Sequence, residues 1–171
     1  MPMVQAALGS AIVGPTCKIL LGSAVSNELE FCTPENASVI IGRILGDHTS
    51  RNFDHFVFVG TGPGAHLASE AALKMRETGG AWTEAYPAME LRHGPMSALS
   101  PRSLVWSLGA GPEGLGDEVA RTGATWLESA EDPLVALVRV QRLAVANALA
   151  KGLDPDHPRF LSRSVILPGS A

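Results

Sequence analysis

The clearest pattern of hydrophobic and polar positions lies between Phe56 and Pro95. It opens with the run Phe-Val-Phe-Val at positions 56–59, whose aromatic and β-branched residues are typical of a buried strand. A glycine-rich turn follows, and then a segment from His66 to Thr78 in which apolar residues recur at helical spacing. The pattern therefore predicts a strand, a tight turn and a helix that ends at Gly79-Gly80. The apolar face of this helix carries Ala68, Ala71, Ala72 and Met75.

The chain before Phe56 fits more than one interpretation. Residues 35–45 follow the pair Thr33-Pro34, a helix start signal, and predict a helix, but Ser38 to Leu45 equally fits a strand. Residues 11–13 and 18–21 fit either two short strands or one broken helix. We therefore treat residues 1–53 as a leader of undefined structure and place the domain at residues 54–171.

The rest of the chain alternates between apolar runs and helical patterns. Residues 79–101 are predicted to form a loop. Asp132 and Pro133 are start signals for a long core helix. Strands that alternate with helices predict an α/β fold, a three-layer α/β/α sandwich around a parallel sheet. The predicted elements are a strand at 103–108, a helix at 115–122, a strand at 124–127, a helix at 132–151 and, at 164–167, a final strand or an extended arm.

Composition narrows the function classes. With 171 residues, 46% of them hydrophobic, the chain is long enough for one domain with a packed core. Its net charge of −4 gives no basic surface for nucleic acid, and no segment reaches the ~20 apolar residues of a membrane span. Cys17 and Cys32 lack zinc-type spacing and are interpreted as free thiols, so no metal is expected. The start lacks the positive region of a signal peptide, which favours a cytoplasmic protein.

The turn after the first strand is a candidate binding site. Gly60, Gly62 and Gly64 permit a tight turn and the close approach of a ligand. Backbone N–H groups there lie at the carboxyl end of a parallel sheet, where open α/β folds bind ligands. We therefore predict substrate contacts at Gly60, Thr61 and Gly62. The spacing G-x-G-x-x-A also fits a dinucleotide-binding module, although the strand at 103–108 ends without the acidic residue that would bind a ribose.

A second group of candidate residues begins on the predicted helix. An amine, carboxylates and a histidine, which together can move protons on a sugar or carbonyl substrate, lie between Lys74 and His93. Glu70, Lys74 and Glu77 at helical spacing more often form a solvent-exposed ion-pair face. A single histidine beside Gly-Pro is usually an ordinary loop residue. The residue types alone leave both interpretations open.

Several ordered motifs make the match to one family specific. Residues 72–77, 83–86 and 90–95 resemble the ALKxxE helix, the AEAY-like turn and the E-L-[KR]-H-G-P loop of SIS (sugar isomerase) domains. Residues 152–165 resemble the family ending G-x-D-x-D-x-P-R-x-L-[AST]-K-S-V. The resemblance covers about residues 54–167. It is to the second SIS lobe of glutamine–fructose-6-phosphate aminotransferases and of related sugar-phosphate isomerases and deaminases, and it implies a flavodoxin-like sandwich.

The resemblance implies catalytic roles for three residues. Glu77 matches the carboxylate that moves a proton between C1 and C2 of an open-chain hexose or amino-hexose 6-phosphate. His93 matches the residue that opens the sugar ring, and in related proteins this histidine can reach the active site of the neighbouring subunit. Lys74 matches the lysine that contacts the substrate or tunes the base. No cofactor is implied.

Two departures from the family pattern change the expectation. Arg163 stands where the aminotransferases have a lysine placed to form a Schiff base; arginine stays protonated, but it can bind a phosphate or an enediolate oxygen. The S-x-S-G-x-T loop with which a first lobe holds the sugar phosphate does not appear in the sequence. We therefore expect isomerisation or deamination by a homodimer or by a pairing with a separate first lobe. The alternative is a non-catalytic phosphosugar-binding module; neither nucleic acid nor a membrane is expected as a partner.

Overall fold

A four-stranded parallel sheet forms the centre of the protein. The computed structural model describes residues 33–46 and 52–159. Within these residues the strands lie in the order β2-β1-β3-β4, and every neighbouring pair is parallel. The predicted parallel α/β architecture is therefore confirmed. The strands are β1 (His55–Gly60), β2 (Trp82–Pro87), β3 (Ser103–Ser107) and β4 (Thr125–Glu128).

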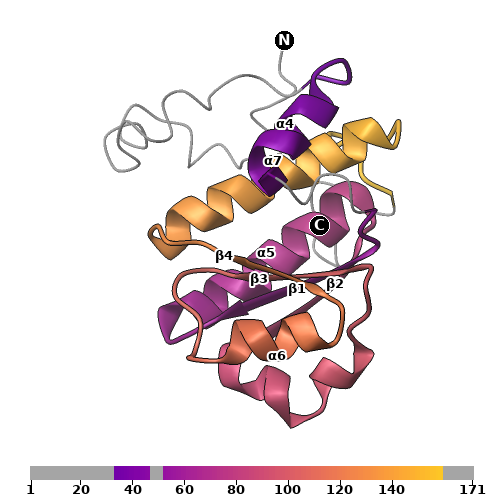
Figure 1. Ribbon diagram of the computed structural model, residues 1–171. Coiled ribbons are helices and arrows are strands. Elements are labelled where there is room, and N and C mark those ends of the chain that lie inside the picture. Colours follow the sequence, from indigo (N-terminus) through magenta and orange to yellow (C-terminus); the bar gives the residue numbers. More distant parts are fainter. Residues whose placement is uncertain (1–32, 47–51, 160–171) are drawn as a thin grey trace, which may run out of the picture.

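Helices cover both faces of this sheet and give three layers (Figure 1). One face presents Phe56 and Phe58 to a core that also contains Met75 of the long helix after β1. The other face presents Val57 and Val59 to a second core, because successive side chains of a strand point to opposite faces. The first face is covered by α5 (Pro63–Gly79), α7 (Pro133–Ala150) and α4 (Ala37–Leu45), and the second by η2 (Ala88–His93), η3 (Pro95–Ala98) and α6 (Leu115–Arg121).

Most of the predicted helices are present with small shifts at their ends. Residues 37–45 form the helix α4 and not the alternative strand. The helix α5 begins at Pro63, three positions before the predicted start, because proline is well suited to the first turn. The helix α7 begins as predicted: the Asp132 carboxylate accepts a hydrogen bond from the Leu134 backbone N–H at 2.8 Å.

The prediction of a loop across residues 79–101 is wrong. Strand β2 and the short helices η2 and η3 lie within this range. Strand β2 is an edge strand, and its residues Trp82, Glu84 and Tyr86 alternate with Thr83, which is buried against α5. A polar edge strand lacks the continuous apolar run by which buried strands are recognised. The hydrophobic pattern of the sequence therefore did not predict β2.

Helix α7 is long and apolar enough to cross a membrane, judged by its length and composition alone. Half of it, however, is buried inside the protein. It packs against both α5 and α4, which is the environment of a core helix. The helix α4, although it lies within the predicted leader, therefore belongs to the same packed body as α7. The expectations for residues 11–13, 18–21 and 164–167 lie outside the described residues.

Candidate functional site

The glycine turn after β1 brings the first residues of α5 close to the C-terminal end of β3 and to the first residue of α7. A Cβ atom on Gly60 would lie 2.3 Å from the backbone carbon of Gly64, so only glycine fits at this position. A Cβ atom on Gly64 would lie 2.9 Å from the Leu108 carbonyl oxygen and near Pro133. Gly62 has a φ of +51°, in the left-handed region. The turn therefore has a packing role that the three glycines satisfy.

The same turn uses most of its own hydrogen-bond donors. The Gly64 N–H donates to the Thr61 carbonyl at 2.9 Å, and the Ala65 N–H donates to the Gly62 carbonyl at 3.1 Å. Pro63 has no N–H. Few backbone N–H groups are therefore left to bind an anion at this helix start, and they include those of Thr61 and Gly62. The predicted substrate contacts at Gly60, Thr61 and Gly62 stay a prediction.

Lys74 and Glu77 lie together near the end of α5. The Lys74 Nζ atom is 3.1 Å from Glu77 Oε2 and 3.4 Å from Glu70 Oε1, so the ammonium is held between two carboxylates. All three side chains are partly exposed, between 29% and 41%. The Glu70 carboxylate is a third member of this group. Its helical spacing had predicted a position on a solvent-exposed ion-pair face. Its signal in the sequence is the i, i+4 interval to Lys74.

The charges of this group act on the pKa of Lys74. Partial burial acts to lower that pKa, and the hydrogen bond and charge of Glu77, with the charge of Glu70, outweigh burial and raise it. Lys74 therefore stays protonated at neutral pH and can stabilise negative charge on a substrate beside Glu77. Glu77 itself keeps a solvent-accessible carboxylate, which a proton-transfer base requires.

His93 lies on a different part of the fold from Lys74 and Glu77. It ends η2, and its side chain is exposed. Glu77 precedes the first residue of β2 on the face that α5 covers, whereas η2 follows the last residue of β2 and packs on the other face. The sheet therefore separates Glu77 from His93 within one subunit.

The loop that carries His93 is fixed to α6 by its neighbour in sequence. The Arg92 Nε atom donates to Glu118 Oε2 at 2.7 Å, and Arg92 Nη2 donates to Glu118 Oε1 at 2.9 Å. Arg92 Nη2 also donates to the Glu113 carbonyl at 2.9 Å. Two parallel hydrogen bonds between a guanidinium and a carboxylate define both distance and orientation. Arg92 therefore fixes this loop to α6 through Glu118.

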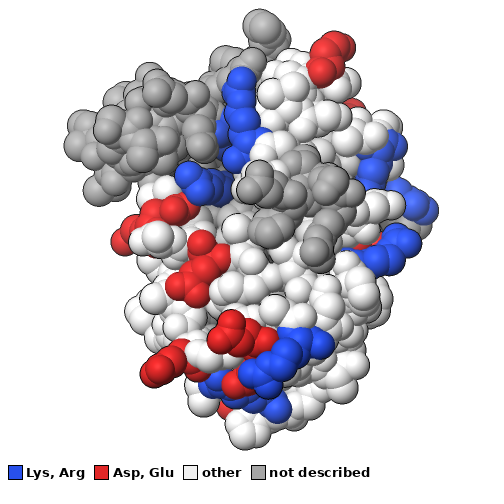
Figure 2. Space-filling model, in the orientation of Figure 1, with Lys and Arg blue, Asp and Glu red and all other residues white. Residues whose placement is uncertain are grey.

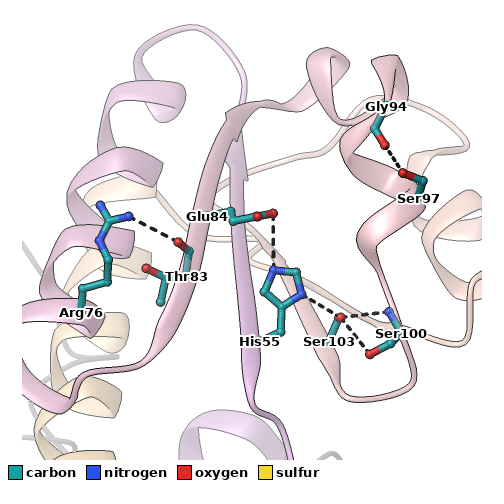
Figure 3. A network of polar contacts seen from close by, with 8 residues as sticks. All are labelled: His55, Arg76, Thr83, Glu84, Gly94, Ser97, Ser100 and Ser103. Atoms are coloured by element: carbon teal, nitrogen blue, oxygen red, sulfur yellow. Dashed lines mark hydrogen bonds and ion pairs between the residues drawn. The ribbon is translucent and has the colours of Figure 1, made fainter.

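A buried histidine of β1 contacts a residue of β2 and a residue of β3 (Figure 3). His55 is 1% exposed, and its Nδ1 atom lies 3.0 Å from the Ser103 Oγ atom. Its Nε2 atom lies 3.4 Å from Glu84 Oε2, and its ring stacks on Trp82 at 4.2 Å. Burial and the Glu84 carboxylate raise the pKa of Tyr86 on the same face of β2. Glu84 thus contacts the buried His55 and acts on the pKa of Tyr86.

Arg163 lies outside the described residues. Within 33–46 and 52–159, no three His, Cys, Asp or Glu side chains gather in a way that could hold a metal ion.

Comparison with known proteins identifies the domain. The model of the SIS domain family matches residues 51–113. Glutamine–fructose-6-phosphate aminotransferase (isomerizing) from Aeropyrum pernix is 32% identical over 136 residues, which are 63% of this chain and 22% of the relative. The enzyme of the same name from Acidithiobacillus ferridurans is 33% identical over 142 residues, 66% of this chain and 23% of the relative. The chain thus spans less than a quarter of the length of these relatives.

Solved structures agree with this match. A glucosamine-6-phosphate deaminase from Thermotoga maritima superimposes with a TM-score of 0.67 and 28% identity, over 77% of this chain and 46% of the deaminase chain. The C-terminal domain of glucosamine-fructose-6-phosphate aminotransferase from Francisella tularensis, at 24% identity and a TM-score of 0.55 over 72% of this chain and 43% of that one, shares the fold. The family model, the aminotransferase relatives and this shared fold thus agree that the chain resembles SIS-domain proteins, with residues 51–113 matching the SIS domain itself.

Proposed function

We propose that this chain is the second lobe of an aldose–ketose isomerase, or a deaminase, that acts on a hexose or amino-hexose 6-phosphate. The observation that carries the proposal is the pair formed by Lys74 and Glu77, 3.1 Å apart and open to solvent near the end of α5. The names of the similar proteins, aminotransferases that isomerise fructose 6-phosphate and a glucosamine-6-phosphate deaminase, support the substrate class.

In this proposal Glu77 moves the proton between C1 and C2 of the open-chain sugar. A carboxylate can take the C2 proton and return it to C1 through an enediol, provided that it lies close to both carbons. Lys74 stays protonated beside it and stabilises the oxygen on which negative charge develops. Arg163, which cannot form a Schiff base, is proposed to bind an anionic group of the same ligand.

His93 is proposed to act in the site of a second copy of the chain. It is exposed, and the sheet separates it from Glu77 of its own subunit, so a site that needs both residues requires two subunits. A homodimer, or a pairing with a separate first lobe, is therefore part of the proposal. We place the protein in the cytoplasm, with a domain that runs to residue 171 and includes the helix α4 of the predicted 1–53 leader.

The test is proton exchange at C2 of the substrate. The full chain is incubated in D2O with glucose 6-phosphate or glucosamine 6-phosphate, each of which has a proton on C2, and loss of the C2 proton signal is followed by NMR. An isomerase or deaminase exchanges this proton with at least one of these sugars. A chain that exchanges none of them, alone or after dimer formation is confirmed, is not an isomerase of this class.

A non-catalytic phosphosugar-binding module is the second candidate. It is favoured by Arg163, which stands where the aminotransferases of the family have a lysine placed to form a Schiff base. Binding without exchange distinguishes the two functions. In a thermal-shift measurement, a hexose 6-phosphate that binds the folded state raises the melting temperature in either case. Only the enzyme also exchanges the C2 proton.

A further inference from the structure

We propose that His55 is a proton-dependent contact between β1 and β2: when its buried ring takes up a proton, it holds the start of β2 through Glu84 and Trp82 (Figure 3). The observation that carries the proposal is a pair of polar atoms, His55 Nε2 and Glu84 Oε2, that face each other at 3.4 Å. Both atoms are buried, and neither makes a hydrogen bond within the described residues. Buried polar groups are nearly always hydrogen-bonded, so this pair is unusual. The proposal goes beyond the proposed function and does not depend on it.

The serine on the other side of the ring can serve both charge states of His55. The Ser103 Oγ atom lies 3.0 Å from His55 Nδ1 and accepts a hydrogen bond from the Ser100 N–H, also at 3.0 Å. A hydroxyl both donates and accepts, so it donates to Nδ1 of a neutral ring that carries its proton on Nε2. When the ring is charged, Nδ1–H donates to Ser103 Oγ, and the serine proton turns toward Ser100 Oγ at 3.4 Å. Neither state leaves Nδ1 without a partner.

The groups that stabilise a charged ring both belong to β2. Trp82 stacks on His55 with ring centroids 4.2 Å apart and ring planes at 23°, and the face of an indole attracts a cation. A buried charge is costly unless it is paired, and the Glu84 carboxylate supplies that pair. Protonation of His55 therefore strengthens the contact between the first residues of the two strands.

The other charges near the ring on β1, β2 and β3 have partners of their own or are neutral. Glu84 supplies the one carboxylate that pairs with His55 in the described part of the chain. Tyr86, the next residue on the same face of β2, stays neutral near neutral pH, because burial and the Glu84 carboxylate raise its pKa. The neighbouring charges, Asp54 and Arg102, pair with each other at 2.7 Å and are exposed.

The short helices over this face leave the same pair in control. The helix η3 carries no charged residue, and Arg92 of η2 is paired with Glu118 of α6. The other titratable or charged residues of η2 and α6 are exposed: Glu90, His93, Asp117 and Arg121. The charge of His55 is therefore governed first by Glu84.

Strand β2 is placed to respond to this contact. It is an edge strand, and within the described sheet it is hydrogen-bonded to β1 alone. It also joins the end of α5 to η2, so a firmer start of β2 fixes the path between these two helices. Histidine ordinarily changes charge between about pH 5 and about pH 8. We therefore expect β2 to be held more firmly at the acidic end of this range.

The test follows the full chain by NMR from about pH 8 to about pH 5. It records the His55 ring C–H signals, the Trp82 indole N–H signal, and amide hydrogen exchange of β2 corrected for its intrinsic pH dependence. The variants are His55→Gln, Glu84→Gln and, as the matched control, His66→Gln, because His66 is an exposed histidine of α5 on the other face of the sheet.

The proposal predicts that the Trp82 signal shifts in step with the His55 ring as the pH falls. In wild type and His66→Gln, the β2 amides exchange at least about threefold more slowly at the acidic end of the range. His55→Gln shows neither change. In Glu84→Gln the ring remains but the carboxylate that favours its charge is gone, so His55 takes up its proton at a lower pH than in wild type.

Three results overturn the proposal. They are a His55 ring that gains no proton down to about pH 5, a titration that neither Trp82 nor β2 follows, and an unchanged titration midpoint in Glu84→Gln. If His55→Gln does not fold, wild type and Glu84→Gln decide the question. No sugar enters these measurements, so their outcome is separate from that of the proposed function.

Discussion

Glu77 and His93 lie only 16 positions apart in sequence, yet strand β2 and the sheet stand between them. Glu77 precedes β2 on the face covered by α5, and His93 follows it on the face covered by η2 and α6. Six residues of β2 correspond to roughly 16–20 Å of strand. If both residues serve one reaction, each site takes Glu77 from one subunit and His93 from another.

Mixed dimers test this sharing directly. We predict that Glu77→Gln and His93→Ala are each inactive alone, and that mixing them after subunit exchange restores C2 proton exchange. Half of the dimers are then mixed and each mixed dimer has one complete site, so the recovered rate reaches up to about a quarter of wild type. Rates are measured by NMR, and dimer formation is checked by light scattering. No recovery in a mixture shown to contain mixed dimers places His93 outside the shared site.

The glycine turn makes a prediction about stability. Gly60→Ala puts a Cβ atom 2.3 Å from the backbone of Gly64, so the turn has to move. We expect a loss of roughly 1–3 kcal/mol or more in the free energy of unfolding, the usual cost of overpacking. Denaturant titration gives this value. Thr61→Ala, at an exposed position of the same turn, is the control and should stay within about 0.5 kcal/mol of wild type.

The ion pair between Arg92 and Glu118 predicts how stability depends on pH. The hydrogen bond from Arg92 lowers the pKa of Glu118. A lowered pKa in the folded state contributes stability that is present above the unfolded pKa, about 4.3 for a glutamate, and is lost as pH falls through the folded value. We therefore expect Glu118→Gln to reduce the fall in melting temperature between about pH 6 and about pH 3.

Asp117→Asn, on the same helix α6, is the control for that measurement, because Asp117 makes no hydrogen bond or ion pair to Arg92 in the described structure. Thermal unfolding of the three proteins across the pH series gives the comparison. Parallel curves for wild type and Glu118→Gln mean that the pair adds no pH-dependent stability.

Arg163 makes a chemical prediction. An arginine stays protonated near neutral pH and so offers no free amine to attack a ketose carbonyl. We expect no borohydride-trapped adduct with fructose 6-phosphate at this position, as judged by mass spectrometry of the intact protein. An adduct of one sugar phosphate that maps to Lys74 means that imine chemistry proceeds by another route.

Two sequence features, the apolar run of β1 and the start signal of α7, predicted their elements correctly. The run Phe-Val-Phe-Val is buried on both faces of β1, so its hydrophobicity is continuous. Asp132 at the start of α7 accepts the hydrogen bond that an N-cap residue should accept. The hydrophobic pattern did not predict β2, because Glu84 and Tyr86 of this edge strand are only partly buried and polar groups are tolerated there.

The candidate site was predicted only in part for the same reason. The interval between Lys74 and Glu77 is a local helical property, so the sequence places these two side chains together. The relation of Glu77 to His93 depends on whether residues 82–87 form a loop or a strand, because a strand places the two residues beyond its opposite ends. The hydrogen bond from Lys151 to the Gly79 carbonyl depends on how α7 packs on α5. Residue spacing in the sequence does not predict such a tertiary contact.

The central claim is that the Glu77 carboxylate is the base, and one exchange measurement tests it most directly. Wild type, Glu77→Gln and Glu113→Gln are compared in D2O with the hexose 6-phosphate that wild type exchanges fastest, and binding is measured in parallel. Glu113 is an exposed carboxylate that precedes α6, so its variant makes the same chemical change away from α5. We predict that Glu77→Gln binds the sugar and loses C2 proton exchange, because the amide keeps the shape and lacks the basicity, while Glu113→Gln exchanges as wild type does. Exchange by Glu77→Gln at the wild-type rate contradicts the account.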